Sequence, residues 1–318
     1  MLDSLRRRLQ PDVWQDVRDG FEGWYYKAQT AEGEIFCVIP GISRQPDDPH
    51  SFIQLLDGFG TRYLRYPVEA FTGAADRLEV HVGDSVFTAE GYRLCTPEIQ
   101  AEIRFSSPVP YCPRRYTLGV MGPFALLPRV ECRHGVVLAD SRADGFFRWE
   151  NGARQITGGR GYVEKDWGRA FPHSYVWCHA FLDDGASFML SAATVPLGRA
   201  CVRGVIAFLR TRDGWRKWVT YTGARVVSAR SLPGGAATLR VASPGSSLEV
   251  TLRPGAEGTL AAPSAAGMSR QVRESTAGLL ELCVTGHGGV ARYRAACGLA
   301  CIEICGDPAS LAAGRAQG

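Results

Sequence analysis

The chain has 318 residues, of which 45% are hydrophobic and 21% charged, and its 36 basic and 32 acidic side chains leave a formal net charge of +4. This composition is typical of a folded protein with one large or two average domains. The small charge, with no basic stripe interleaved with aromatic residues, argues against nucleic acid as a partner.

The N-terminal residues, MLDSLRRRLQPDVW, contain an arginine run without an apolar segment behind it. They therefore predict no signal peptide, and no stretch of the chain approaches the ~18 apolar residues of a membrane span. Leu2, Leu5 and Leu9 could line one face of a short helix beside Arg6–Arg8 and touch an anionic membrane. The alternative is a frayed terminal helix. We expect a cytoplasmic protein, with peripheral membrane contact as an option.

Short strands separated by Gly, Asp and Pro turns are predicted after Pro11. They are FEGWYYKAQT, GEIFCVIPGI, SFIQLLDG, RYLRYPVEAF, DRLEVHVG, DSVFTAEG and EIQAEIRF. Residues 107–131 carry five prolines and interrupt this rhythm, as an irregular covering segment would. Strands resume at residue 132, and the GGRG of residues 158–161 is interpreted as a turn because no helix follows it.

The second half of the chain repeats the strand pattern from YVWCHAFLDDG to CIEICGD. Amphipathic segments of helical length are nearly absent, so we predict an all-β fold of two packed antiparallel barrels or sandwiches. The predicted domains are residues 12–160 and 161–318, with a ligand pocket in one of them or between them. A monomer or weak homodimer is expected.

The ten cysteines include no CxxC pair, which favours a reducing compartment over a disulfide framework. Cys297, Cys301 and Cys305 are spaced by four residues within a predicted strand and are interpreted as small buried hydrophobes. Their spacing is wider than that of a typical zinc site, so we predict no metal and no cofactor.

Residues 158–185 hold the densest collection of titratable and aromatic side chains in the sequence. In a strand from Ser174 to Phe181, alternation places four residues on one face. They are Tyr175, Trp177, His179 and Phe181. An aromatic face with an embedded imidazole suits a ligand pocket, but an aromatic core with a satisfied histidine has the same composition. FEGWYYK, residues 21–27, similarly puts Glu22, Trp24 and Tyr26 on one strand face.

FEGWYYK and GYVEKDWGRAFP, followed by the aromatic strand at Tyr175–Trp177, resemble the tocopherol cyclase family. MGPFALLPRVECRHGVV (121–137) and the closing strands extend the resemblance to about residues 19–306. It implies a pair of lipocalin-like β-domains. It also implies cofactor-independent chemistry, in which an alkene of a prenylated hydroquinone is protonated and the phenol oxygen attacks the resulting cation.

The resemblance suggests roles for ten residues of the two aromatic stretches. The candidate acids and bases are Asp166, Glu164, His179 and Glu22. A neutral carboxylic acid in apolar surroundings can protonate an alkene, and an imidazole or carboxylate can accept the phenol proton. The candidate substrate-binding and cation-stabilising rings are Trp24, Tyr26, Trp167, Tyr175, Trp177 and Phe181. Structural salt bridges at strand ends are the alternative for the acids.

Two departures leave the substrate open. The family carries Gln and Asn where this chain has His179 and Phe181, so its head-group recognition or its reaction could differ. We expect a hydrophobic small-molecule substrate and a cyclase, with a pericyclase, an alkene hydratase or a non-catalytic lipophile-binding protein as alternatives. Arg270, Arg273 and Glu274 are expected to form a charged network at the domain junction.

Overall fold

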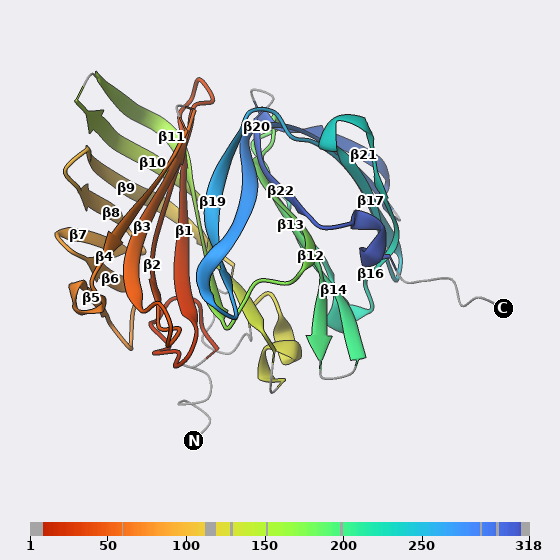
Figure 1. The fold of residues 1–318 in the computed structure, drawn as a ribbon. Coiled ribbons are helices and arrows are strands. Elements are labelled where there is room, and N and C mark those ends of the chain that lie inside the picture. The colour runs from red at the N-terminus through yellow and green to blue at the C-terminus, as the bar shows by residue number, and fades with distance from the viewer. Residues whose placement is uncertain are drawn as a thin grey trace. The chain divides into compact units, whose positions relative to one another are not determined.

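The structure is a computed structural model that describes residues 9–58, 60–111, 119–127, 130–150, 152–197, 200–286, 288–296 and 299–312. Leu2, Leu5, Arg6–Arg8 and Cys297 therefore lie outside the described residues. Within the described part, strands and short 3₁₀ turns account for the regular structure and no α-helix is present. The predicted all-β fold is confirmed (Figure 1).

The chain forms two compact units. The N-terminal unit comprises Met1–Leu126, Cys132–Phe171 and Leu260–Gln271, and the C-terminal unit comprises Leu127–Glu131, Pro172–Thr259 and Val272–Gly318. The sequence placed the boundary at residues 160/161, but contacts keep residues 161–171 with the N-terminal unit because their strand continues without a break to Gly168.

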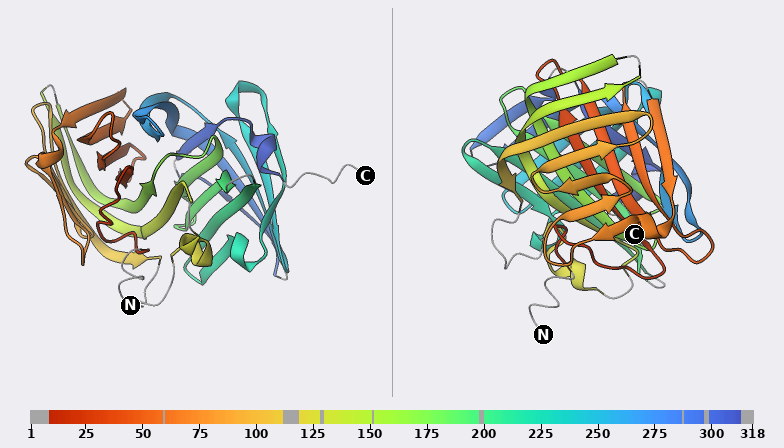
Figure 2. Two further views of the ribbon diagram at one scale, coloured as in Figure 1. Left: turned by 60° about the horizontal axis from the view of Figure 1, so that its bottom comes forward. Right: turned by 90° about the vertical axis from the view of Figure 1, so that its left-hand side faces the viewer.

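An eleven-stranded antiparallel sheet forms the N-terminal unit, in the order β4-β3-β2-β1-β11-β10-β9-β8-β7-β6-β5, and curves strongly around its inner face (Figure 2). Its strands are β1 Phe21–Gln29, β2 Ile35–Ser43, β3 His50–Asp57, β4 Gly60–Tyr66, β5 Phe71–Gly73, β6 Glu79–Val82, β7 Ser85–Thr88, β8 Gly91–Cys95, β9 Ile99–Pro110, β10 Cys132–Trp149 and β11 Gly152–Gly168.

The second antiparallel sheet runs in the order β15-β14-β13-β12-β22-β20-β18-β17-β16, with β19 and β21 both paired to β20. Its strands are β12 Ser174–Phe181, β13 Ser187–Leu197, β14 Ala200–Thr211, β15 Gly214–Val219, β16 Arg225–Ser231, β17 Ala237–Ser243, β18 Ser246–Arg253, β19 Glu257–Ser264, β20 Gly267–Gly286, β21 Gly289–Arg294 and β22 Ala300–Cys305.

Alternation along the strands builds a separate core in each unit. The inward residues of β1, among them Trp24 and Tyr26, join the core of the N-terminal unit. In the C-terminal unit, Val176, Cys178 and Ala180 of β12 join the core. Tyr175, Trp177, His179 and Phe181 thus lie on the opposite face of β12, as the sequence predicted.

The GGRG segment is strand rather than turn, which corrects the sequence interpretation. Residues 158–161 lie within β11, and Gly158, with φ +64°, lies near a register irregularity against β10. A Cβ at Gly161 would stand 2.4 Å from the ring of Phe105, and one at Gly159 would stand 2.5 Å from the carbonyl oxygen of Gln29. These glycines permit close approach of neighbouring groups.

The hairpin arm, residues 260–271 of β19 and β20, belongs to the N-terminal unit although it is far along the chain. The Gln54 side chain bonds both backbone groups of Ala261, at 2.9 Å from its nitrogen to the carbonyl and 2.8 Å from the amide to its oxygen. Gln45 Nε2 donates to the carbonyl of Ser264 at 3.2 Å. On the edge of β19 that bonds these residues, the side-chain amides of Gln45 and Gln54 therefore take the place of a neighbouring strand.

Candidate active site

A charged network lies on the face of β10 and β11 that points away from the inner core. His134 is paired with Asp166 across these strands, and alternation puts Glu164 and Tyr162 on the same face. His134 Nδ1 lies 2.9 Å from Asp166 Oδ1, and its Nε2 lies 3.5 Å from Glu164 Oε2. The Tyr162 hydroxyl donates a very short hydrogen bond to the same Glu164 oxygen.

Burial and charge oppose each other at His134. Burial alone lowers the pKa of the imidazole, but the carboxylates of Asp166 and Glu164 outweigh it and raise the pKa to about 9. At neutral pH the ring is therefore an imidazolium between two carboxylate groups. Glu164 is nearly fully buried, whereas 24% of the Asp166 side chain is exposed. Asp166 is thus the acid that a ligand can reach.

The donor atoms of His134, Glu164 and Asp166 all lie within 4.8 Å of one another, a spacing that could hold a metal ion. The raised pKa of His134 puts a proton on both ring nitrogens, so a metal ion would have to displace one of these protons in order to bind.

Glu22 of β1 lies on the other face of the same sheet, in a buried ion pair with Lys165. Lys165 Nζ stands 2.7 Å from Glu22 Oε2 and donates to the carbonyl of Val13 at 2.8 Å. The Glu22 carboxylate also accepts the backbone N–H groups of Gln15 and Val17, at 2.9 and 2.8 Å. This predicted acid thus ties the N-terminal segment to the sheet.

Three of the rings predicted to bind substrate belong to the same inner face. Lys165 Nζ lies 4.4 Å from the ring centroid of Trp24 and 5.0 Å from that of Trp167. The cation–π arrangement that the sequence suggested for a substrate cation is thus occupied by the chain's own ammonium. Tyr26 is fully buried among Phe87, Tyr92 and Phe105, and its hydroxyl donates to the carbonyl of Thr88 at 3.0 Å.

The remaining predicted site residues lie in the C-terminal unit, on the outer face of β12. All four are buried, and His179 Nε2 lies 3.3 Å from the hydroxyl of Ser187. The His179 and Phe181 rings meet edge to face, with centroids 4.9 Å apart. Trp177 is paired with Glu303 of β22 across the sheet. The structure therefore places His179 in a different unit from Asp166.

Two acidic residues lie on this part of the C-terminal unit, Glu303, which the sequence analysis did not single out, and Glu274, which it expected in a charged network. Glu303 accepts a 2.6 Å hydrogen bond from the hydroxyl of Tyr175. Glu274 of β20 is fully buried and paired with Glu303. Of the residues of the predicted charged network, Arg270 donates to the carbonyl of Phe171 at 3.3 Å, and Arg273 forms an exposed ion pair with Glu257 at 3.2 Å.

His134 was also missed, although it lies within the MGPFALLPRVECRHGVV stretch that carried the family resemblance. Its neighbours in sequence are a cysteine, an arginine and a glycine, and no nearby residue marks it as reactive. Pairing of β10 with β11 brings it to Asp166, 32 residues away.

A profile of the family described as tocopherol cyclase-like matches residues 107–306. Among solved structures, the AttH protein of Nitrosomonas europaea is similar at a TM-score of 0.55 and 16% identity, over 92% of this chain and 94% of that one. Kievitone hydratase of Nectria haematococca is similar at a TM-score of 0.50 and 12% identity, over 94% and 91%. No curated protein sequence matches the chain. At these identities the two structures establish a shared fold.

Proposed function

The chain belongs to the tocopherol cyclase-like family, because the match spans more than half of it, and from that premise we propose that it is a cyclase. Its substrate is a prenylated aromatic or polyene lipophile, and it closes a ring by protonating an alkene. The observation that carries the proposal is the Asp166–His134–Glu164 network, a reachable carboxyl beside a buried imidazolium.

The proposed reaction begins when Asp166, carrying a proton taken up from water, transfers that proton to the alkene. The tertiary cation that results is attacked by an oxygen of the same substrate, and the proton released from that oxygen returns to Asp166. The substrate is isomerised and the network is restored.

The surroundings of Asp166 support this chemistry. On its face of β1, alternation presents Phe21 and Tyr25, which are buried and can offer ring faces to a cation. The Tyr162 hydroxyl donates to Glu164, and His134 lies between Glu164 and Asp166. These contacts orient the Asp166 carboxyl before the substrate binds.

The experiment is an anaerobic incubation in deuterated water with a panel of prenylated hydroquinones and polyenes, followed by mass spectrometry of the products. A cyclised isomer with one solvent deuterium supports the cyclase. An unlabelled isomer indicates a pericyclase, and a gain of one heavy water indicates a hydratase like the one named among the structural neighbours. Unchanged lipophile that co-purifies indicates a binding protein.

Substitution of the acid tests its assignment. Asp166→Asn is expected to lower turnover by about 10²-fold or more, because a general acid contributes roughly 10²–10⁴. Asp144→Asn is the matched control, since Asp144 is an exposed carboxylate of β10 whose partner is Arg142. Wild-type turnover by both Asp166→Asn and Glu164→Gln would exclude the network as the proton donor.

A further inference from the structure

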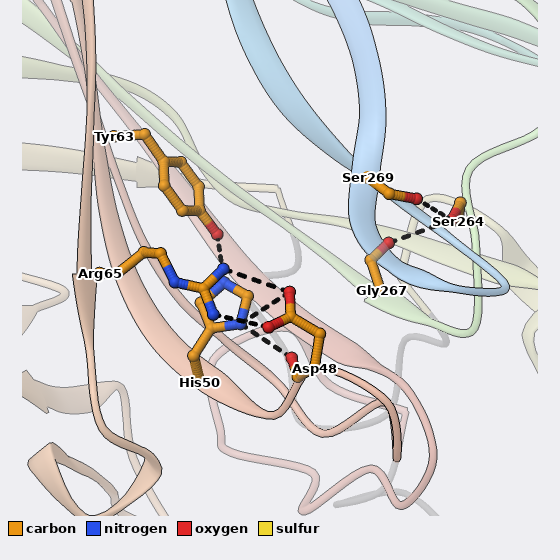
Figure 3. A network of polar contacts seen from close by, with 7 residues as sticks. All are labelled: Asp48, His50, Tyr63, Arg65, Ser264, Gly267 and Ser269. Atoms are coloured by element: carbon orange, nitrogen blue, oxygen red, sulfur yellow. Dashed lines mark hydrogen bonds and ion pairs between the residues drawn. The ribbon is translucent and has the colours of Figure 1, made fainter.

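A second polar cluster lies at β3 and β4 of the N-terminal unit, where Asp48, His50 and Tyr63 form a chain of contacts that we call the relay (Figure 3). The His50 ring stands between Asp48 and Tyr63, with Nε2 2.6 Å from the Tyr63 hydroxyl and Nδ1 2.9 Å from the Asp48 carbonyl oxygen. The Asp48 carboxylate lies 3.5 Å from the same Nδ1 and forms two hydrogen bonds with Arg65, at 2.6 and 3.2 Å. The backbone carbonyl and the side-chain carboxylate of Asp48 therefore both lie next to Nδ1 of His50.

This geometry selects one tautomer of His50. A carbonyl oxygen only accepts, so Nδ1 carries a hydrogen, and in the singly protonated ring this leaves the lone pair of Nε2 to accept from Tyr63. The Tyr63 O–H therefore points at His50, which leaves the lone pairs of its oxygen for another donor. Burial raises the pKa of Tyr63, so the hydroxyl stays protonated.

The members of the relay differ in exposure. His50 is 2% exposed, whereas Tyr63 is only partly buried. Phe52 stacks on the Tyr63 ring, with centroids 5.4 Å apart, and supplies an apolar wall. The turn of the hairpin arm supports Asp48, because a Cβ at Gly267 would lie 3.4 Å from the Asp48 Cβ (Figure 3).

The relay shares a sheet face with the acid network but cannot act on the same atoms. Gly23 of β1 pairs with both Asp166 and Gly41, and Gly41 pairs with Phe52 of β3. Gln54, two residues after Phe52, pairs with Tyr63, so alternation places Tyr63 and Asp166 on one face. Four strand spacings separate β4 from β11, which is roughly 19 Å at ~4.8 Å per strand. Atoms that bond in a ring closure must approach to about 3 Å. The relay therefore serves another part of a ligand.

We propose that Tyr63, backed by His50 and Asp48, is a hydroxyl-binding subsite that accepts a hydrogen bond from an alcohol or phenol of a lipophilic ligand. The ligand O–H donates to the Tyr63 oxygen, and the Tyr63 O–H donates to His50 Nε2. If the ligand is the substrate of the proposed cyclase, on which this part of the inference rests, the substrate is elongated and carries a hydroxyl far from its reacting alkene.

The test compares 4-nonylphenol with 4-nonylanisole, its methyl ether, which has the same tail and no O–H. Calorimetric titration of the wild-type protein is expected to show the phenol binding about tenfold more tightly, the effect of one well-formed hydrogen bond. Tyr63→Phe is expected to bind both probes with the affinity that the wild type shows for the ether. A preference that is absent in the wild type, or that survives in Tyr63→Phe, overturns the proposal.

A second measurement needs no variant. In protein labelled with ¹⁵N-histidine, the Nε2 resonance of His50 is expected to shift on addition of the phenol and to stay in place with the ether. A resonance that responds equally to both probes overturns the proposal. Asp166→Asn is expected to keep the phenol preference while losing turnover, so failure of the subsite and failure of the proposed cyclase are distinguishable.

Discussion

At the scale of single residues, His134 holds a charge that its burial opposes. Its pKa of about 9 lies above the value near 6.5 of an unfolded histidine. Proton binding therefore stabilises the folded state, and the contribution is complete below about pH 6.5 and lost as the pH rises through 9. The difference corresponds to about 3 kcal/mol.

We expect the free energy of unfolding, measured by urea titration, to fall between pH 6.5 and 9 in the wild type. His134→Gln is expected to be less stable at pH 6.5 and to show a flatter profile over this range. His81→Gln is the control, because His81 is a partly exposed histidine of β6. An unchanged slope in His134→Gln would contradict the assignment of the imidazolium.

The Glu22–Lys165 pair makes a second prediction at this scale. Its two side chains are 1% and 0% exposed, so removal of one partner leaves a buried charge uncompensated. Lys165→Met is expected to cost about 3–5 kcal/mol of unfolding free energy. Glu22→Gln combined with Lys165→Met is expected to recover part of this loss in the same urea titration. If the loss in the double variant equals the sum of the losses in Lys165→Met and in Glu22→Gln alone, the two charges are not coupled.

At the scale of elements, the hairpin arm depends on side-chain amides rather than on a neighbouring strand. Gln54→Ala leaves the N–H and C=O of Ala261 without these partners, so hydrogen exchange at residues 260–264 is expected to accelerate by about 10-fold or more. Gln100→Ala, at an exposed position of β9, is the control. Exchange in the arm that is unchanged by Gln54→Ala would assign its attachment to other contacts.

Strands were predictable where alternation is strong. The sequence predicted β12 from Ser174 to Phe181 and the faces of its residues, because small apolar and aromatic side chains alternate there without interruption. It failed at GGRG, since a glycine that permits close packing and a glycine that permits a turn look the same without the neighbouring strand.

The site itself was less predictable than its strands. Trp24, Tyr26 and Trp167 were chosen as rings around a cation. Trp24 and Trp167 do lie beside one, but it is Lys165 of the same strand as Trp167. His134 and the His50–Tyr63 relay depend on pairing between strands. A linear pattern gives the face of each residue within its strand, whereas the register between strands decides which residues meet.

At the scale of the whole molecule, the two cores predict two separately responding units. Ile53→Ala, in the core of the N-terminal unit, is expected to cost about 2–5 kcal/mol. It should accelerate hydrogen exchange in residues 21–168 and also in the distant residues 260–271, which belong to the same unit. Leu252→Ala, in the core of the C-terminal unit, is the matched variant. An arm that responds to Leu252→Ala alone would contradict this division.

The late position of the hairpin arm in the chain has a consequence for synthesis on the ribosome. The N-terminal sheet is complete at Phe171, but its last segment ends at Gln271, roughly a hundred residues later, which is about 5–20 s of translation. During that interval the amides of Gln45 and Gln54 have no arm to bind. A nascent chain therefore exposes these two amides to water until its own arm emerges, and a message truncated between these points yields an N-terminal sheet that lacks one segment of its compact unit.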